Sequence, residues 1–242
     1  MGLSHNLRTP RTVLAVGAHP DDVEFGCGGT LAKWASAGAE VTIAVITDGS
    51  IGTWDPGRDP DALREQRRRE AERAAEVLGC KGGVVFLGAP DGFLEANRTL
   101  RRELCRVIRD VRPEVVLGHD PWRTDRLHPD HRHAGFLTLD AVCIAREPAA
   151  EPELGEAHRA GIVLLFETDR PDHIEDVTGH EQTKARALEC HESQFVSTMQ
   201  ITDPSDHEEL ERFRRRVDRE LSDIGGRFGF VRAEAFRAIR EV

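Results

Sequence analysis

The stretch VLAVGAHPDD, residues 13–22, decides the fold of this chain and points to its site. Its first half, residues 13–17, is apolar and ends in glycine, which predicts a short strand buried within a sheet. Its second half carries His19, Asp21 and Asp22. Ligands of an open α/β sheet bind just beyond the carboxyl ends of the strands, so we expect these side chains at a ligand site.

A second segment repeats this arrangement further along the chain. Residues 115–118 (VVLG) form another apolar run, and the motif HPDH follows at residues 128–131. It contributes His128, Asp130 and His131. Because both clusters follow probable buried strands, we expect one site assembled from two loops at the same edge of the sheet.

Apolar runs alternate with amphipathic segments throughout the chain. We expect strands at residues 13–17, 41–47, 84–87, 114–118, 162–167 and 174–177, and helices at residues 28–37, 61–78, 100–111, 133–145, 182–191 and 205–222. This alternation predicts an α/β fold, a Rossmann-like and mostly parallel sheet flanked by helices, with the metal site at the C-terminal edge of the strands. We expect one domain over residues 1–242, and a solvated face on the charged helix at 205–222.

The composition favours a globular protein that acts on a small molecule. Of 242 residues, 39% are hydrophobic and 31% are charged, and the net charge of −10 argues against nucleic-acid binding, which needs a basic surface. The amino-terminal segment lacks the apolar core of a signal peptide, and no run approaches the roughly 20 apolar residues of a membrane helix. The five cysteines form no C-x-x-C pair, which favours reduced thiols and a cytoplasmic location without a membrane partner.

His19, Asp22 and His131 have the residue types of a catalytic metal centre. Two imidazoles and one carboxylate, with a fourth position left for water, are typical of catalytic zinc. The same set suits non-haem Fe(II) oxygenases, but the parallel α/β architecture argues against that class by analogy. We expect Zn2+, with Fe2+, Ni2+ or Co2+ as substitutes. For Asp22, capping of the following helix is an alternative role.

The remaining residues of the two motifs suggest acid–base chemistry. Asp21 lies between two expected ligands and can reach a water molecule at the metal, which makes it the natural general base. An aspartate that holds an imidazole favours the protonated or correctly oriented ring, so Asp130 and His128 are candidates for stabilising a developing oxyanion.

These motifs resemble the PIG-L/LmbE-like deacetylases, metal-dependent enzymes that remove an acetyl group from N-acetylglucosamine conjugates. The resemblance covers most of the chain. It is carried by GAHPDD (17–22), GCGGT (26–30), Arg67-x-x-Glu70, LG (78–79), PDG (90–92), LHPDHR (127–132), HESQF (191–195) and AEAF (233–236).

The resemblance implies zinc ligation by His19, Asp22 and His131, and the role of general base for Asp21. It also implies that His128 stabilises the tetrahedral intermediate, with Asp130 orienting the His128 ring.

Three further positions are implied to contact the substrate. Arg67 matches an arginine that binds the sugar or its appended group, although a solvated helix face is the alternative. Asp91 matches a loop aspartate near the sugar hydroxyls, although a turn residue before Gly92 is the alternative. Arg126 stands where some members have a tyrosine, and the chain contains no tyrosine, so Arg126 is expected to attract an anionic substrate.

Other histidines are expected to be structural. His191 is assigned to the Ser-Gln segment rather than to catalysis, and surface or core positions are expected for His119, His133, His173 and His180.

The expected function is zinc-dependent hydrolysis of the acetamide of an amino-sugar conjugate, with Asp21 as the base. One alternative is an amidase for another small N-acyl or thiol conjugate. Others are a non-catalytic metal-binding protein and a dinucleotide-binding protein, but Gly26-Cys27-Gly28-Gly29 departs from the G-x-G-x-x-G spacing. The resemblance also implies a homo-oligomer, a trimer or a hexamer.

Overall fold

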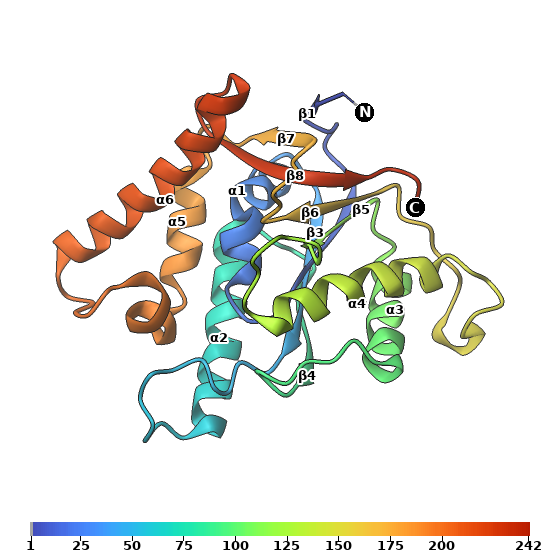
Figure 1. Cartoon of the computed structure of the whole chain (residues 1–242), viewed down its shortest axis with the longest axis horizontal. Helices are drawn as coiled ribbons and strands as arrows, with labels where there is room; N and C mark the ends of the chain where they lie inside the picture. The colour runs from blue at the N-terminus through green and yellow to red at the C-terminus, as the bar shows by residue number, and fades with distance from the viewer. Residues whose placement is uncertain (1) are drawn as a thin grey trace.

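The computed structural model describes residues 2–242 and contains one sheet of eight strands (Figure 1). Their order across the sheet is β1-β7-β8-β6-β5-β2-β3-β4. The strands are Ser4–His5 (β1), Thr12–Gly17 (β2), Glu40–Thr47 (β3), Gly83–Ala89 (β4), Val115–His119 (β5), Ile162–Phe166 (β6), His173–Asp176 (β7) and Ala233–Ile239 (β8). Within residues 2–242 only β8 pairs antiparallel, with β6 and with β7, so the expected mostly parallel sheet is confirmed.

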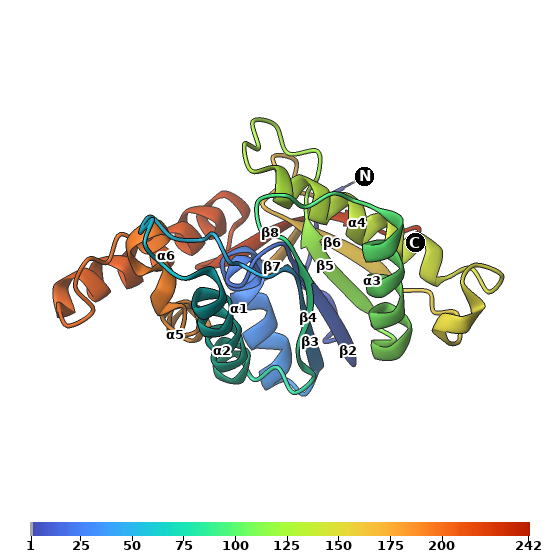
Figure 2. The ribbon, with the colours of Figure 1, turned by 90° about the horizontal axis from the view of Figure 1, so that it is seen from below.

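Helices cover both faces of this sheet. They are α1 (Asp22–Ser36), α2 (Pro60–Leu78), α3 (Arg98–Val111), α4 (Pro129–Ala145), α5 (Glu181–Glu189) and α6 (His207–Phe228), with short turns at Pro152–Leu154, Glu192–Gln194 and Phe195–Met199. Helices α1 and α2 pack on one face, and α3 and α4 on the other (Figure 2). Successive side chains of β2 alternate between these two cores, as the pleat of a strand requires.

Helix α1 begins at Asp22 rather than at residue 28, because it is two helical pieces joined at a break. Cys27 lies at the break, with φ −151 and ψ 16. A Cβ atom on the neighbouring Gly26 would come within 2.4 Å of the Phe166 ring. Glycine at residue 26 therefore allows α1 to lie close against β6.

The break frees two backbone N–H groups, which a carboxylate from the end of the chain accepts. The N–H groups of Gly29 and Thr30 donate to the Glu234 carboxylate at 2.9 and 2.7 Å. Lys184 of α5 donates to the same carboxylate at 2.6 Å. Glu234 thus caps the second piece of α1, as anions do at helix N-termini.

Two helices and one strand also differ from expectation. Helix α4 begins at Pro129, where proline suits the first helical position, and not at residue 133. Helix α6 continues to Phe228 and ends at Gly229, which has φ 84. Strand β8 was not expected, because its alternation is interrupted by charged residues.

Helix α6 is not only a solvated face. Its Phe213, Val217 and Leu221 recur every four residues and are buried in a small core shared with α5 and the turn at Phe195–Met199. None of the helices within residues 2–242 combines the length and apolar character needed to cross a bilayer.

Arg109 of α3 holds the loop after α4 in place through main-chain carbonyls. Its side chain is buried, and no carboxylate within residues 2–242 pairs with it. The guanidinium donates to six carbonyl oxygens, those of Ile144, Ala145, Glu147, Ala150, Glu151 and Gly155. One buried cation therefore satisfies the end of α4 and the turn that follows.

We expect Arg109→Met to lower the free energy of unfolding by about 2–4 kcal/mol, because buried carbonyl groups lose their donors. Urea unfolding measures this loss. Arg106→Met, on the exposed face of the same helix, is the matched control and should change stability by less than about 0.5 kcal/mol. Equal stability of the two variants would contradict the structural role of Arg109.

Candidate metal centre

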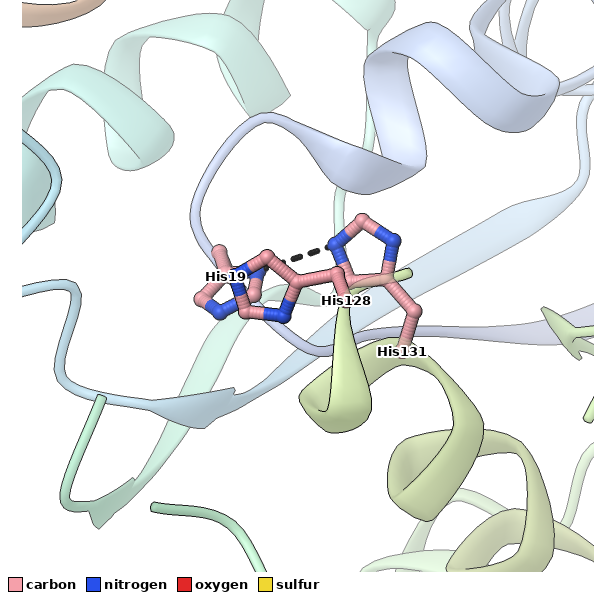
Figure 3. A group of neighbouring side chains, drawn as sticks. All are labelled: His19, His128 and His131. Carbon is pink, nitrogen blue, oxygen red and sulfur yellow. Dashed lines mark hydrogen bonds between the residues drawn. The ribbon is translucent and has the colours of Figure 1, made fainter. Parts of the chain in front are cut away.

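The two motif loops meet at the carboxyl edge of the sheet. Strands β2 and β5 are parallel neighbours, paired at Val13 with Val115 and at Ala15 with Leu117. The loop after β2 carries His19, and the loop after β5 leads into α4 and His131. Figure 3 shows the rings of His19, His128 and His131 gathered in one place.

The loop after β2 is tightly wound. Asp21 has φ 108, a backbone conformation that residues other than glycine rarely adopt. Strained conformations of this kind occur mostly at functional sites. The His19 backbone N–H donates to the Asp22 carboxylate at 2.7 Å, which closes the turn. Asp22 therefore organises the loop in addition to starting α1.

His19, Asp22 and His131 bring two ring nitrogens and the two oxygens of one carboxylate together. His19 Nδ1 lies 3.1 Å from His131 Nε2 and 3.3 Å from Asp22 Oδ2. His131 Nε2 lies 3.2 Å from Asp22 Oδ1. Donors on a tetrahedral zinc ion, at bonds of about 2.0–2.1 Å, stand roughly 3.3 Å apart, so the donor set fits such an ion.

The second nitrogen of His19 faces two carboxylates. His19 Nε2 lies 3.1 Å from Asp91 Oδ1 and 3.2 Å from Asp130 Oδ2. Burial alone would lower the pKa of His19, but the carboxylates of Asp22, Asp130 and Asp91 raise it well above its ordinary value. A carboxylate on the outer nitrogen also orients a metal-binding imidazole, which leaves Nδ1 to face the centre.

Asp130 contacts the His19 ring and can orient it, whereas the resemblance implied that Asp130 orients the His128 ring. Its two oxygens accept from the backbone N–H groups of Gly92 and Leu94 at 2.7 and 3.1 Å. With His19 added, both oxygens of the carboxylate are engaged, and Asp130 is buried at the start of α4.

His128 lies at the cavity as an exposed ring. It stacks on His131 with centroids 4.8 Å apart and meets His19 edge-on at 4.7 Å. Partial burial and the neighbouring His19 hold the pKa of His128 below its ordinary value. The lowered pKa favours the neutral form of the His128 ring in the metal-free protein.

His119 belongs to the centre, although the sequence analysis placed it among structural histidines. It ends β5 and is buried, with Nε2 3.2 Å from Asp22 Oδ2 and Nδ1 3.1 Å from Glu167 Oε2. Burial alone would raise the pKa of Asp22, but His119 and His19 hold it well below its ordinary value. The position of His119 at a strand end was the signal that could have identified it.

Arg126 is held beside His131 and away from the cavity surface. Its Nη2 donates to Glu167 at 2.6 Å and contacts His131 Nδ1. Since guanidinium only donates, Arg126 must turn to Glu167 alone when His131 Nε2 binds a cation. The expected attraction of an anionic substrate by Arg126 stays a prediction.

Asp21 is buried at the floor of the site. Burial raises the pKa of its carboxyl to about 6, with Arg67 opposing the rise and the neighbouring Asp22 adding to it. Arg67 Nη2 lies 3.6 Å from Asp21 Oδ1. A carboxyl group with a pKa near the working pH can both accept and return a proton.

Arg67 and Asp91 line the cavity, but other groups of the protein occupy most of their polar atoms. Arg67 donates to the carbonyl oxygens of Pro20 and Gly49 at 2.7 and 3.1 Å. Asp91 faces His19, and its second oxygen accepts from the Ile51 N–H at 3.3 Å. Both residues hold the motif loop and line the cavity, and their expected contacts with a sugar stay predictions.

The donor atoms lie at one end of a cavity of about 810 Å3, a size in the upper part of the range for small-molecule sites. Three overlapping sets of metal-binding side chains, His19/His128/His131, Asp22/His119/His131 and His19/Asp91/Asp130, bring potential donors within 4.8 Å of one another. Helix α6 also lines this cavity, with Glu220, Asp223, Ile224 and Arg227.

Known proteins are similar to this chain in sequence. Residues 14–142 match the family model described as GlcNAc-PI de-N-acetylase. The chain is 39% identical over 189 residues to a diacetylchitobiose deacetylase of Thermococcus kodakarensis, covering 76% of this chain and 70% of that protein. It is 34% identical to a 1D-myo-inositol 2-acetamido-2-deoxy-alpha-D-glucopyranoside deacetylase of Kineococcus radiotolerans, covering 57% of this chain and 46% of that protein.

A solved structure is similar over nearly the whole chain. The N,N'-diacetylchitobiose deacetylase from Pyrococcus horikoshii superimposes with a TM-score of 0.84 at 29% identity, covering 96% of this chain and 84% of that one.

We expect His119→Ala to weaken Zn2+ binding by about 10–100-fold, because the imidazole that holds Asp22 is lost. Competition with a chromophoric chelator measures this affinity. His180→Ala, outside the histidine and carboxylate network, is the control. Unchanged affinity in His119→Ala would show that Asp22 needs no such support.

The raised pKa of Asp21 predicts how metal-free stability depends on pH. Between its ordinary pKa of about 3.9 and the folded value of about 6, the folded protein binds the extra proton. The stability that Asp21 contributes is therefore present below about pH 4 and lost as pH rises through 6. We expect the free energy of unfolding of metal-free Asp21→Asn to exceed that of the parent by about 1–3 kcal/mol at pH 7. At about pH 4 the two free energies should be equal.

Urea unfolding at both pH values checks this prediction. A variant that is less stable than the parent at pH 7 would show that interactions of the Asp21 carboxylate outweigh the cost of its burial.

Proposed function

This chain belongs to the PIG-L family, and from that premise we propose that it is a metal-dependent hydrolase that removes the N-acetyl group of an N-acetylglucosamine-type conjugate. The observation that carries the proposal is the meeting of His19 Nδ1, Asp22 and His131 Nε2 within 3.3 Å of one another at one end of the cavity, beside Asp21. Names of relatives point to the same chemistry, since both similar curated proteins are deacetylases of amino-sugar conjugates.

In this proposal His19, Asp22 and His131 hold a divalent cation, Zn2+ by preference and Fe2+, Ni2+ or Co2+ as substitutes. When bound, such a cation lowers the pKa of a coordinated water and polarises a substrate carbonyl. Asp91 and Asp130 orient His19, and His119 orients Asp22. These contacts keep three donor atoms aimed at one point without reorganisation.

Residues of this chain carry out the proton transfers and stabilise the developing charge. Asp21 is the general base: it takes a proton from the attacking water and then gives it to the nitrogen that leaves as an amine. His128 faces the cavity and donates a hydrogen bond to the carbonyl oxygen as negative charge develops there. The products are acetate and a free amino sugar.

The substrate-binding assignments are revised in this proposal. Arg67 holds the backbone of the HPDD loop beside Asp21, and Asp91 holds His19, so both are positioning residues. Arg126 acts on Glu167. In this proposal the acetamide of the substrate contacts the donor set, Asp21 and His128.

Location and assembly are also proposals. The five cysteines form no disulfide in the described residues, and Cys27, Cys80 and Cys105 are buried, which supports a reducing, cytoplasmic location. One domain over residues 1–242 and a homo-oligomer complete this description.

The test is the release of primary amine from N-acetylglucosamine, N,N'-diacetylchitobiose and an inositol-linked conjugate by zinc-loaded protein. We expect chelator-sensitive release from at least one compound. Asp21→Asn should retain zinc and lose turnover by several orders of magnitude, whereas His131→Ala should lose zinc.

Elemental analysis of each purified variant separates the two effects. No amine release by protein that holds zinc would reject the deacetylase proposal, and normal turnover by Asp21→Asn would reject its base.

A further inference from the structure

The imidazole of His191 is buried beside the metal centre and takes no part in the mechanism proposed above. His191 follows α5, its side chain is 0% exposed, and neither ring nitrogen has a hydrogen-bond partner within residues 2–242. Glu24 Oε1 lies 3.6 Å from His191 Nε2, which is the distance of an ion pair rather than of an ordinary hydrogen bond. Buried polar groups normally have partners, so a ring in this state calls for an explanation beyond packing.

Glu24 is directed at His191 instead of at the start of its own helix. Asp21 and Glu24 have the spacing of a capping box, in which two side chains accept hydrogen bonds from backbone N–H groups at the helix start. The Asp21 side chain makes no such cap, and the Glu24 carboxylate does not accept from the Asp21 N–H. Glu24 is 2% exposed. Its carboxylate therefore stabilises positive charge on the His191 ring instead of stabilising the helix end.

The Asp21 carboxylate is held by charges alone. Asp21 lines the cavity, and its side chain accepts no hydrogen bond from the described part of the chain. Arg67 Nη2 is 3.6 Å away on one side. Because Asp21 and Glu24 are three residues apart at the start of α1, both lie within reach of a ring placed behind that turn.

The pKa of His191 reports that its ring is near both carboxylates. Burial alone would lower this pKa, but Glu24 and then Asp21 raise it above its ordinary value. The effect is mutual, because Arg67 and His191 both oppose the raised pKa of Asp21. Asp21 thus has a second cation behind it in addition to Arg67.

The turn that carries His191 is rigid and keeps the ring out of the cavity. The Ser193 backbone N–H and hydroxyl donate to the buried Glu70 of α2 at 2.9 and 2.6 Å. Gln194 lines the cavity, whereas His191 does not. His191 therefore cannot contact a substrate, and any effect on the reaction must act through another residue.

We propose that His191, paired with Glu24, is a positioning residue: its ring, as a cation behind the floor of the site, holds the Asp21 carboxylate in the orientation that faces the cavity. The inference rests on the proposed function, in which Asp21 is the general base. It explains why Asp21 keeps a strained backbone without a hydrogen bond to its side chain.

The experiment separates kcat from KM for amine release by zinc-loaded protein. The substrate is whichever of N-acetylglucosamine, N,N'-diacetylchitobiose and the inositol-linked conjugate the parent hydrolyses fastest. In His191→Gln we expect kcat to fall about 10–100-fold, as when a residue that orients a site group is lost, with KM within about twofold of the parent. Glu24→Gln, which leaves the ring in place, should also lower kcat. The double variant should be no slower than His191→Gln, because the two residues act as a unit.

His173→Gln is the matched control. His173 is equally buried, and its Nε2 lies 2.8 Å from the buried Glu175, but it does not line the cavity. We expect His173→Gln to lose stability in urea and to keep the kcat of the parent. Equal kcat values in His173→Gln and His191→Gln would overturn the inference. Loss of zinc from His191→Gln would also overturn it, because the effect would then lie at the metal.

Protonation of the His191 ring gives a readout that needs no turnover. At pH 6.5, the ordinary pKa of histidine, nitrogen-15 NMR of the metal-free protein should show this ring more than half protonated. The protonated fraction should fall in Asp21→Asn, because the carboxylate that attracts the proton is lost. A neutral ring in the parent, or a ring unaffected by Asp21→Asn, would overturn the inference. A ring that responds to Asp21→Asn in a protein that binds zinc and releases no amine would reject the deacetylase proposal and keep the pairing of His191 with Asp21.

Discussion

The parallel pairing of β2 with β5 is the constraint on which the rest of the site depends. It sets Val13 beside Val115 and Ala15 beside Leu117, so that two segments distant in the sequence leave the sheet at the same edge. His19 Nδ1 and His131 Nε2 then lie 3.1 Å apart, although the two residues are distant in the sequence. A strand order that separated β2 from β5 would divide the donor set between two places.

Around this pair of strands, buried carboxylates and imidazoles contact and stabilise one another. Asp22 touches His19, His119 and His131, and Asp130 and Asp91 share the outer nitrogen of His19. Isolated, each of these groups would be costly to bury, but in a network each opposite charge offsets the desolvation of its neighbours. The exception is Asp21, which combines a strained backbone with a raised pKa, and it is the residue for which proton transfer is proposed.

The carboxyl-terminal part of the chain completes the site from a distance. Glu234 of β8 caps the second piece of α1, and Lys184 of α5 joins that carboxylate. Helix α6 packs on α5 and lines the cavity that contains the candidate metal donors. The GCGG segment, which could be mistaken for a dinucleotide-binding turn, is instead the point where α1 breaks and meets Phe166 and Glu234.

Local patterns in the sequence determined much of this protein. Apolar runs of five to seven residues located the central strands, and the polar motifs in the loops after two of them pointed to His19, Asp21, Asp22 and His131, because strand ends converge in a parallel sheet. Such patterns could not predict contacts between side chains that are distant in the sequence. That Asp130 holds His19, that His119 supports Asp22 and that α6 lines the cavity were decided only by the tertiary structure, since strand pairing and helix packing set those distances and leave no periodic signal in the chain.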